Sequence, residues 1–322
     1  SAVAGNEAVA DSIDSNPPGE VPVVAPQPAP VDLEPAPDPL LGAETIFRVS
    51  DNQRLTYTDL PARNITEPAS GTIVLLHDFG SASTQWQATA ALLNEFSRVI
   101  AMDLRGHGNS SRLACCYSAL DMAGDVIKLL DTLGVDRATL VGSGGGGLVA
   151  QKVATGSPHR VSHLVLIGSD SSAAGNSRYQ DFQRQAASFG EIGADEQFIR
   201  TWNDTGAARE DGAEQRLHLL GLAQRNTPAA VWADSLVGFV QADSSDAVAG
   251  LQIPTLLMAG DADTVMGPAS QRSFALSLRS EVVVPVIGSG RYPSIDNPAQ
   301  LAGNIRKFLS PRGTLHASTF LY

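Results

Sequence analysis

One stretch decides the fold of this chain: Leu140-Val141-Gly142-Ser143-Gly144-Gly145-Gly146-Gly147-Leu148-Val149-Ala150. The apolar residues before the glycines predict a buried strand over 138–141, and the spacing after them predicts a helix over 149–155. A strand that turns through glycines directly into a helix is typical of open parallel α/β sheets. In such sheets, ligands bind where the strands end.

Strands and helices alternate on both sides of this turn. The expected strands are 45–49 and 55–58 as a hairpin, then 72–76, 98–103, 138–141, 161–167, 254–259 and 282–286. The expected helices are 85–96, 119–133, 149–155, 270–278 and 298–309. Residues 171–250 interrupt the alternation, are polar, and have helical spacing where they are periodic. The pattern therefore predicts an α/β fold with a mostly parallel central sheet, helices on both faces and an inserted helical cap.

The two ends of the chain have a different composition. Residues 1–42 hold seven of the 34 Asp and Glu residues and no Lys or Arg, so they account for most of the net charge of −12. The segment is rich in Pro and Ala and predicts an extended or disordered arm. The domain assignment is thus an arm over 1–42, a core over 43–170 and 251–310, a cap over 171–250 and a tail over 311–322. The arm and the tail are candidate contact sites for protein partners.

Composition excludes several classes of protein. A net-negative chain without a dense Lys/Arg cluster lacks the charge pattern of a nucleic-acid binder. No apolar run approaches the roughly 18 residues that a transmembrane helix needs. The only cysteines, Cys115 and Cys116, are adjacent, which excludes a Cys-rich zinc site. We expect two thiols rather than a disulfide there, and no metal or cofactor. The start at Ser1 fits either an exported or organellar protein after processing or a soluble cytoplasmic one.

Five short segments follow expected strands, in a fixed order along the chain. They are His77-Asp78-Phe79-Gly80, Asp103-Leu104-Arg105-Gly106-His107-Gly108, the glycine stretch at 142–147, Gly260-Asp261-Ala262-Asp263 and Gly288-Ser289-Gly290-Arg291. In this order they resemble the α/β-hydrolase superfamily, in its branch of capped lactonases, esterases and dehalogenases. The resemblance covers about residues 45–310. It implies a nucleophile at the glycine turn, a late acid and a final His.

Two positions of that catalytic triad depart from the family pattern. The resemblance places the nucleophile at Gly144, between the flanking glycines Gly142 and Gly146, and Gly144 has no side chain. It places the catalytic base at Arg291, which stays protonated and cannot accept a proton. The acid position keeps its carboxylate in Asp263, which could form a charged pair with Arg291. Ser143 lies one residue before the nucleophile position and is a turn residue or, as a less favoured reading, a displaced nucleophile.

The remaining motif residues concern the oxyanion site and its frame. The backbone N–H groups of Phe79 and Gly145 are expected to point to where an oxyanion would form. Asp78 replaces a glycine that is usual in the family, and its carboxylate disfavours an oxyanion unless it points to solvent. The other motif residues, His77, Gly80, Asp103, Arg105 and His107, are expected to organise the loops.

The loss of both the nucleophile at Gly144 and the base at Arg291 favours a catalytically inactive hydrolase-fold protein. Such a protein would act as a structural or interaction subunit or as a ligand-binding module. Such a module would hold a small apolar ligand under the cap. The alternative is an active esterase or lactonase with a displaced nucleophile, which could be Ser143, Asp170 or a cap residue, and with a base from elsewhere. It also includes such an enzyme disabled by engineering. The spacing Gly142-x-Gly144-x-x-Gly147 also matches a dinucleotide-binding turn. However, a run of four glycines satisfies many patterns, and this reading is disfavoured.

Overall fold

Apolar, β-branched segments form the central sheet of the protein. The computed structural model describes residues 42–64, 71–189, 194–203, 210–278 and 283–310, and eight strands in these ranges form one sheet. They are β1 (Glu44–Ser50), β2 (Gln53–Leu60), β3 (Thr72–Leu76), β4 (Arg98–Met102), β5 (Ala138–Ser143), β6 (Val161–Ile167), β7 (Thr255–Gly260) and β8 (Val283–Val286). Their order across the sheet is β1-β2-β4-β3-β5-β6-β7-β8.

The sheet is parallel except at the N-terminal hairpin. β1 pairs antiparallel with β2, and β2 pairs antiparallel with β4, whereas every pairing from β4 to β8 is parallel. Parallel neighbours require a crossover, and helices supply it after β3, β5, β6 and β7. The carboxyl ends of the parallel strands therefore meet at one edge, where the loops after β3, β5, β7 and β8 come together.

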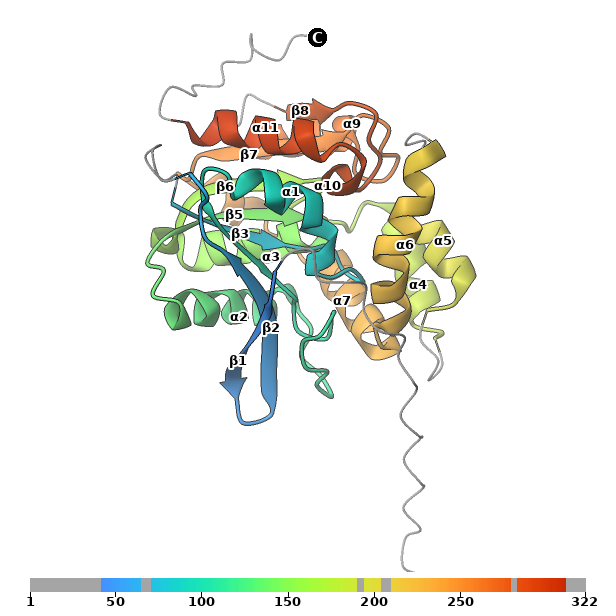
Figure 1. The fold of residues 1–322 in the computed structure, drawn as a ribbon. Helices are drawn as coiled ribbons and strands as arrows, with labels where there is room; N and C mark the ends of the chain where they lie inside the picture. The colour runs from blue at the N-terminus through green and yellow to red at the C-terminus, as the bar shows by residue number, and fades with distance from the viewer. Residues whose placement is uncertain (1–41, 65–70, 190–193, 204–209, 279–282, 311–322) are drawn as a thin grey trace, which may run out of the picture. The chain divides into compact units, whose positions relative to one another are not determined.

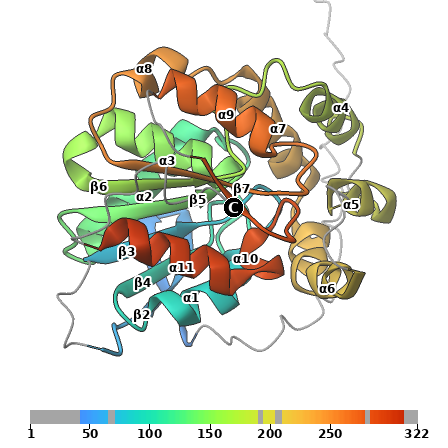
Figure 2. The same cartoon turned by 90° about the horizontal axis from the view of Figure 1, so that it is seen from above.

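Helices cover both faces of this sheet (Figures 1 and 2). The helices outside the cap are α1 (Gln87–Leu93), α2 (Ala119–Thr132), α3 (Gly145–Gly156), α9 (Pro268–Ser277), α10 (Pro293–Asp296) and α11 (Pro298–Leu309), with 3-10 turns η1 (Ser83–Trp86) and η2 (Pro158–Arg160). Successive strand residues point to opposite faces. Val74 and Leu76 accordingly join the core under α2, α3 and α9, while Ile73 and Leu75 join the core under α1 and α11. The expected mostly parallel α/β sheet is confirmed.

The helix after the glycines begins earlier than the sequence suggests. Glycine disfavours helix, so the expected start was residue 149, yet α3 begins at Gly145. Close packing explains the difference, because a Cβ on Gly146 would lie 2.3 Å from the Leu76 carbonyl oxygen and one on Gly147 would lie 2.5 Å from Ser169. These glycines are therefore required by the approach of α3 to the sheet. Tertiary packing outweighs their low helix propensity.

In the described part of the insertion between β6 and β7, five helices form the cap. They are α4 (Ser177–Ala186), α5 (Glu196–Asn203), α6 (Glu210–Asn226), α7 (Ala229–Gln241) and α8 (Ser245–Ala249). Figure 1 shows α4, α5 and α6 beside the sheet rather than on its faces. The buried cap aromatics belong to the same apolar cluster as the α2 and α3 face; they are Tyr179, Phe182, Phe198, Trp202, Trp232 and Phe239. The cap is thus held by a continuous core, and the expected inserted helical cap is confirmed.

The proposed arm over 1–42, except its last residue, and the proposed tail over 311–322 lie outside the described residues. Within the described ranges, no helix combines the length and the apolar composition needed to cross a bilayer.

Candidate functional site

The glycine turn lies at the centre of the site. β5 ends at Ser143, which is buried, and α3 starts at Gly145, so Gly144 alone makes the turn with φ 50° and ψ −118°. This left-handed backbone is open to glycine at little cost. A Cβ atom on Gly144 would lie 2.1 Å from Asp78 Oδ1. The place where a nucleophile's side chain would begin is therefore filled by a carboxylate.

That carboxylate also accepts the two N–H groups expected at an oxyanion site. Asp78 follows β3, and its Oδ1 accepts hydrogen bonds from Phe79 N at 2.9 Å and from Gly145 N at 2.8 Å. The backbone of Asp78 is held in turn by Gln85, whose Oε1 accepts from Asp78 N at 3.1 Å. The side chain of Asp78 is completely buried, so it points into the site and not to solvent. An anionic oxygen of the protein itself thus lies between the donors.

Arg291 holds the other oxygen of Asp78. Its Nε donates to Asp78 Oδ2 at 2.7 Å, and its Nη2 lies 2.7 Å from the same oxygen. The guanidinium carbon lies 4.1 Å from the centre of the Trp202 ring and 5.2 Å from that of Tyr179. Tyr292 borders the same cage and accepts a hydrogen bond from Trp202 Nε1 at 2.9 Å. Sequence reasoning missed this cage, because α4, α5 and the loop after β8 supply it from distant parts of the chain.

The charge of Arg291 is secured by this arrangement. Burial is the largest single influence and would lower the pKa of its guanidinium, but the Asp78 carboxylate together with Tyr179, Tyr292 and Asp263 raises that pKa above its ordinary value. Arg291 is therefore always a cation and cannot serve as a base at any pH of interest. The opposite charges of Arg291 and Asp78 compensate one another inside the protein.

Asp263 does not form the pair with Arg291 that the sequence suggested. Its Oδ1 accepts from Val265 N at 2.8 Å and from Met266 N at 3.1 Å, so this oxygen holds the loop after β7. Its buried Oδ2 has no hydrogen-bond partner among the described residues. Burial raises the pKa of the Asp263 carboxyl. Asp78 forms the ion pair with Arg291 instead.

The two motif histidines are buried, with ring centres 5.2 Å apart, and burial favours the neutral form of both. His77 Nε2 accepts from Leu104 N at 3.0 Å, which leaves the proton on Nδ1 to donate to the Asp78 carbonyl oxygen at 2.7 Å. His107 Nδ1 bonds to the Arg105 carbonyl oxygen at 3.0 Å, and its buried Nε2 has no partner in the described part of the chain. Burial lowers the pKa of His77 to about 4 and that of His107 to about 3.

Asp103 and Arg105 hold the loop after β4. Asp103 Oδ1 accepts from Ser83 N at 2.7 Å, and its Oδ2 accepts from Thr56 Oγ1 at 2.9 Å and Asn109 N at 2.8 Å. Arg105 forms a bidentate salt bridge with Asp125, in which its Nε donates to Oδ2 and its Nη2 donates to Oδ1, each at 2.6 Å. All of these side-chain groups are satisfied by the protein. They position loops and present no free acid or base toward Gly144.

Glycines allow the close approach of the surrounding loops. A Cβ on Gly80, which has φ 72°, would lie 1.9 Å from the Trp232 ring of the cap. A Cβ on Gly142 would lie 2.5 Å from the Gly146 carbonyl oxygen. Within the described ranges, no group of three or more His, Cys, Asp or Glu residues is placed to hold a metal ion.

A comparison with known proteins agrees with this architecture. Residues 71–298 match the family model described as alpha/beta hydrolase fold. The chain is 40% identical over 110 residues to the 2-hydroxy-6-oxononadienedioate/2-hydroxy-6-oxononatrienedioate hydrolase of Paraburkholderia phymatum. This aligned stretch covers 33% of this chain and 38% of that relative. The first curated relatives are matched over well under half of their own length.

Solved structures share the fold over most of the chain. A hydrolase from Pseudomonas aeruginosa superposes with a TM-score of 0.69 at 23% identity, covering 84% of this chain and 99% of that one. The enol-lactonase from Burkholderia xenovorans superposes with a TM-score of 0.67 at 22% identity, covering 80% and 97%. The family match spans most of the described core, and the sheet order and inserted cap accord with it. The chain therefore belongs to the α/β-hydrolase fold family.

Proposed function

We propose that this protein is a catalytically inactive member of its family that acts as a binding module. The observation that carries the proposal is the position of Asp78, whose Oδ1 accepts both N–H groups that would otherwise stabilise an oxyanion. Acyl transfer needs these donors free and aimed at the developing negative charge. A fixed carboxylate there uses the donors and repels that charge.

Acyl transfer also requires a nucleophile and a base, and neither is present at its expected position. The turn residue Gly144 offers no nucleophile, and Arg291 offers no base. The two imidazoles nearest to the site are poor substitutes, because burial holds the pKa of His77 at about 4 and that of His107 at about 3. A displaced nucleophile such as Ser143 would therefore lack an effective proton acceptor. These features support loss of the hydrolytic activity named for its relatives.

Reaction with a serine-hydrolase probe tests this proposal. We expect no covalent labelling of the full chain by a fluorophosphonate and no release of nitrophenol from short-chain nitrophenyl esters above the rate in buffer. An esterase with an intact triad serves as the positive control. Labelling that disappears in Ser143→Ala would establish a displaced nucleophile and contradict the proposal.

A cavity beneath the cap favours ligand binding as the retained role. It has a volume of about 230 Å³ and lies between α6 and the loops after β3 and β4. Its apolar wall comes from Leu219, Leu222 and Ala223 of α6, and its polar lining includes Ser83, Asn109 and the acidic residues Glu44 and Asp103. None of Asp78, Gly144, Asp263 and Arg291 lines it, so it does not depend on the altered triad. A small, mostly apolar ligand with one hydrogen-bonding end suits these walls.

Filling this cavity should abolish binding of an apolar ligand. With N-phenyl-1-naphthylamine as a neutral fluorescent probe, we expect saturable binding to the full chain and a loss of at least about tenfold in affinity in Ala223→Trp. Ala230→Trp, at an exposed position of α7, is the matched control and should bind normally. Equal binding by both variants would place the ligand elsewhere. Absence of binding by the unmodified chain would leave only the interaction role.

A further inference from the structure

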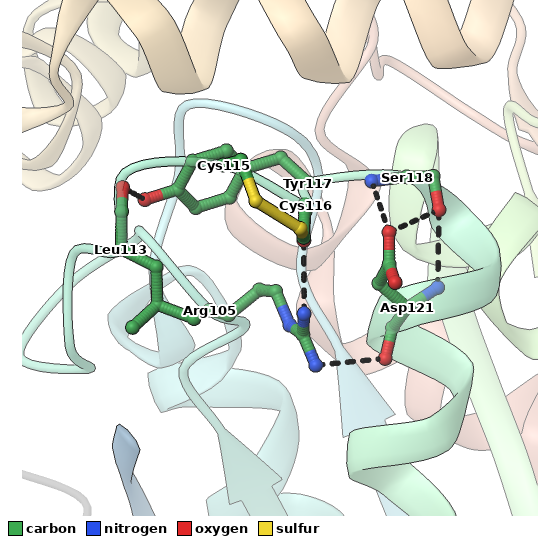
Figure 3. The surroundings of a disulfide bond; sticks show 7 residues. All are labelled: Arg105, Leu113, Cys115, Cys116, Tyr117, Ser118 and Asp121. Atoms are coloured by element: carbon green, nitrogen blue, oxygen red, sulfur yellow. Dashed lines mark hydrogen bonds between the residues drawn. A yellow bond between two sulfur atoms is a disulfide. The ribbon is translucent and has the colours of Figure 1, made fainter. Parts of the chain in front are cut away.

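The loop between β4 and α2 carries a disulfide bond between adjacent residues, Cys115 and Cys116. The expectation of two free thiols is therefore wrong. Sequence could not decide this point, because neighbouring cysteines bond only when the backbone between them takes a suitable turn. Both residues are exposed, and they are the only cysteines of the chain. Figure 3 shows the bond beside Arg105 and just before the start of α2.

The backbone at this bond is unusual. Cys116 has φ 76°, and it is the one residue other than glycine with a positive φ in the described part of the chain. Residues with a side chain disfavour this left-handed region. Nothing in the sequence around Cys116 offsets that preference locally, since no Asn, Asp or Gly occupies the position. The covalent link to Cys115 restrains the backbone at this residue.

This conformation directs the Cys116 carbonyl oxygen toward Arg105. Arg105 Nη1 donates to that oxygen at 2.9 Å, and its Nη2 donates to the Asp121 carbonyl oxygen at 3.1 Å (Figure 3). The start of α2 is fixed in the same place by a capping box, in which Ser118 and Asp121 bond reciprocally. The backbone of the disulfide loop is therefore part of the anchor that joins Arg105 to α2.

The next residue connects the loop to the cap. Tyr117 is buried, and its hydroxyl donates to the Leu113 carbonyl oxygen across the disulfide turn. A Cβ on Gly106 would lie 2.5 Å from the Tyr117 ring and 2.8 Å from Val231 of α7. Tyr117 and α7 thus both pack against the turn at Gly106. The residue that follows Cys116 therefore packs against the same turn as the cap helix α7.

We propose that Cys115–Cys116 is a surface site of thiol–disulfide exchange with an external dithiol, and that its redox state sets the rigidity of the Leu113–Asp121 loop. The inference is independent of the proposed function, since it involves no residue of the altered triad. Exposure lets a reductant reach the sulfurs, and the two thiols formed remain adjacent, so that reoxidation is intramolecular.

The exchange balances with one dithiol molecule. A thiolate of the dithiol attacks one sulfur of the bond and forms a mixed disulfide, while the other cysteine sulfur leaves as a thiolate and takes up a proton. The second thiol of the dithiol then loses its proton to solvent and attacks the other sulfur of the same dithiol molecule, which is bonded to the protein in the mixed disulfide. The bond to the protein breaks, and the remaining cysteine leaves as a thiolate and takes up a proton. Two electrons pass to the protein, and the dithiol becomes a cyclic disulfide. Cys116 is then free to leave the left-handed region, and its carbonyl oxygen leaves Arg105.

Thiol counting tests the site on the full chain. After oxidation with diamide, we expect no maleimide to react with the denatured protein, and after dithiothreitol we expect one label on each cysteine. The oxidised protein should remain monomeric on a non-reducing gel. Two labels on the diamide-treated protein, or a disulfide-linked dimer, would overturn the proposal.

Hydrogen exchange tests the coupling to the loop. We expect amides of residues 113–121 to exchange roughly tenfold faster in the reduced form, because the bond to Arg105 and the covalent restraint are both lost. The variant Cys115→Ser with Cys116→Ser should match the reduced form and should not respond to dithiothreitol. Equal exchange in the oxidised and reduced forms would show that the bond does not control the loop.

Discussion

Replacing Asp78 with alanine is expected to lower the free energy of unfolding by about 3–5 kcal/mol, as measured by urea denaturation. The cause is the guanidinium of Arg291, whose side chain is only 3% exposed and which would lose its ion-pair partner. The two N–H groups of Phe79 and Gly145 would lose their acceptor as well. The buried guanidinium and the two N–H groups cannot form replacement hydrogen bonds with water unless the cap opens.

The fold requires that neither buried charge is left without its partner, and it does not require the ion pair itself. Adding Arg291→Met to Asp78→Ala should therefore cost no more than the single substitution, since methionine fills the aromatic cage without a charge. Asp59→Ala is the matched control, because it breaks the bond of Asp59 with Arg98, which has similar distances but is about one third exposed. That control should cost at most about 1 kcal/mol. Equal losses in Asp78→Ala and Asp59→Ala would contradict the role of the buried pair.

Stability should also fall steeply between pH 8 and pH 5. Burial lowers the pKa of His77 to about 4 and that of His107 to about 3, whereas both side chains have a pKa near 6.5 in the unfolded chain. In this window the unfolded state binds more protons, so acid favours unfolding. At pH 5 each histidine should cost about 2 kcal/mol relative to pH 8. Together they should cost about 4 kcal/mol, measurable by urea denaturation at the two pH values.

One substitution separates the histidines from other titrating groups. In His107→Asn the loss between pH 8 and pH 5 should shrink by about half, because one of the two buried imidazoles is removed. Asp263, whose pKa is raised by burial, changes stability in the opposite sense, but it is present in both proteins and cancels in the comparison. An unchanged loss in His107→Asn would contradict the assignment.

The sequence by itself predicted the fold, and it showed at which motif positions the chain departs from the pattern of the family that it resembles. The apolar runs before Gly142 and Gly260 predict buried strands, and their alternation with helical segments predicts a mostly parallel sheet with helices on both faces. The flanking glycines Gly142 and Gly146 indicate that Gly144 is at the nucleophile position of the family pattern. The segment Gly288-Ser289-Gly290 indicates in the same way that Arg291 is at the position of the final His. The fold inference needs only local patterns and is confirmed by the sheet, whereas the assignment of Gly144 and Arg291 to triad positions stays a prediction.

Only the tertiary structure decided what those changes produce. The direction of the Asp78 side chain depends on Arg291, which lies more than two hundred residues further along the chain, and on the Trp202 and Tyr179 rings of the cap. The state of Cys115 and Cys116 likewise depends on one backbone angle. A sequence pattern reports which groups are present, whereas burial and the partner that compensates a charge arise only when distant segments pack together. Here that packing placed a carboxylate where an oxyanion would form.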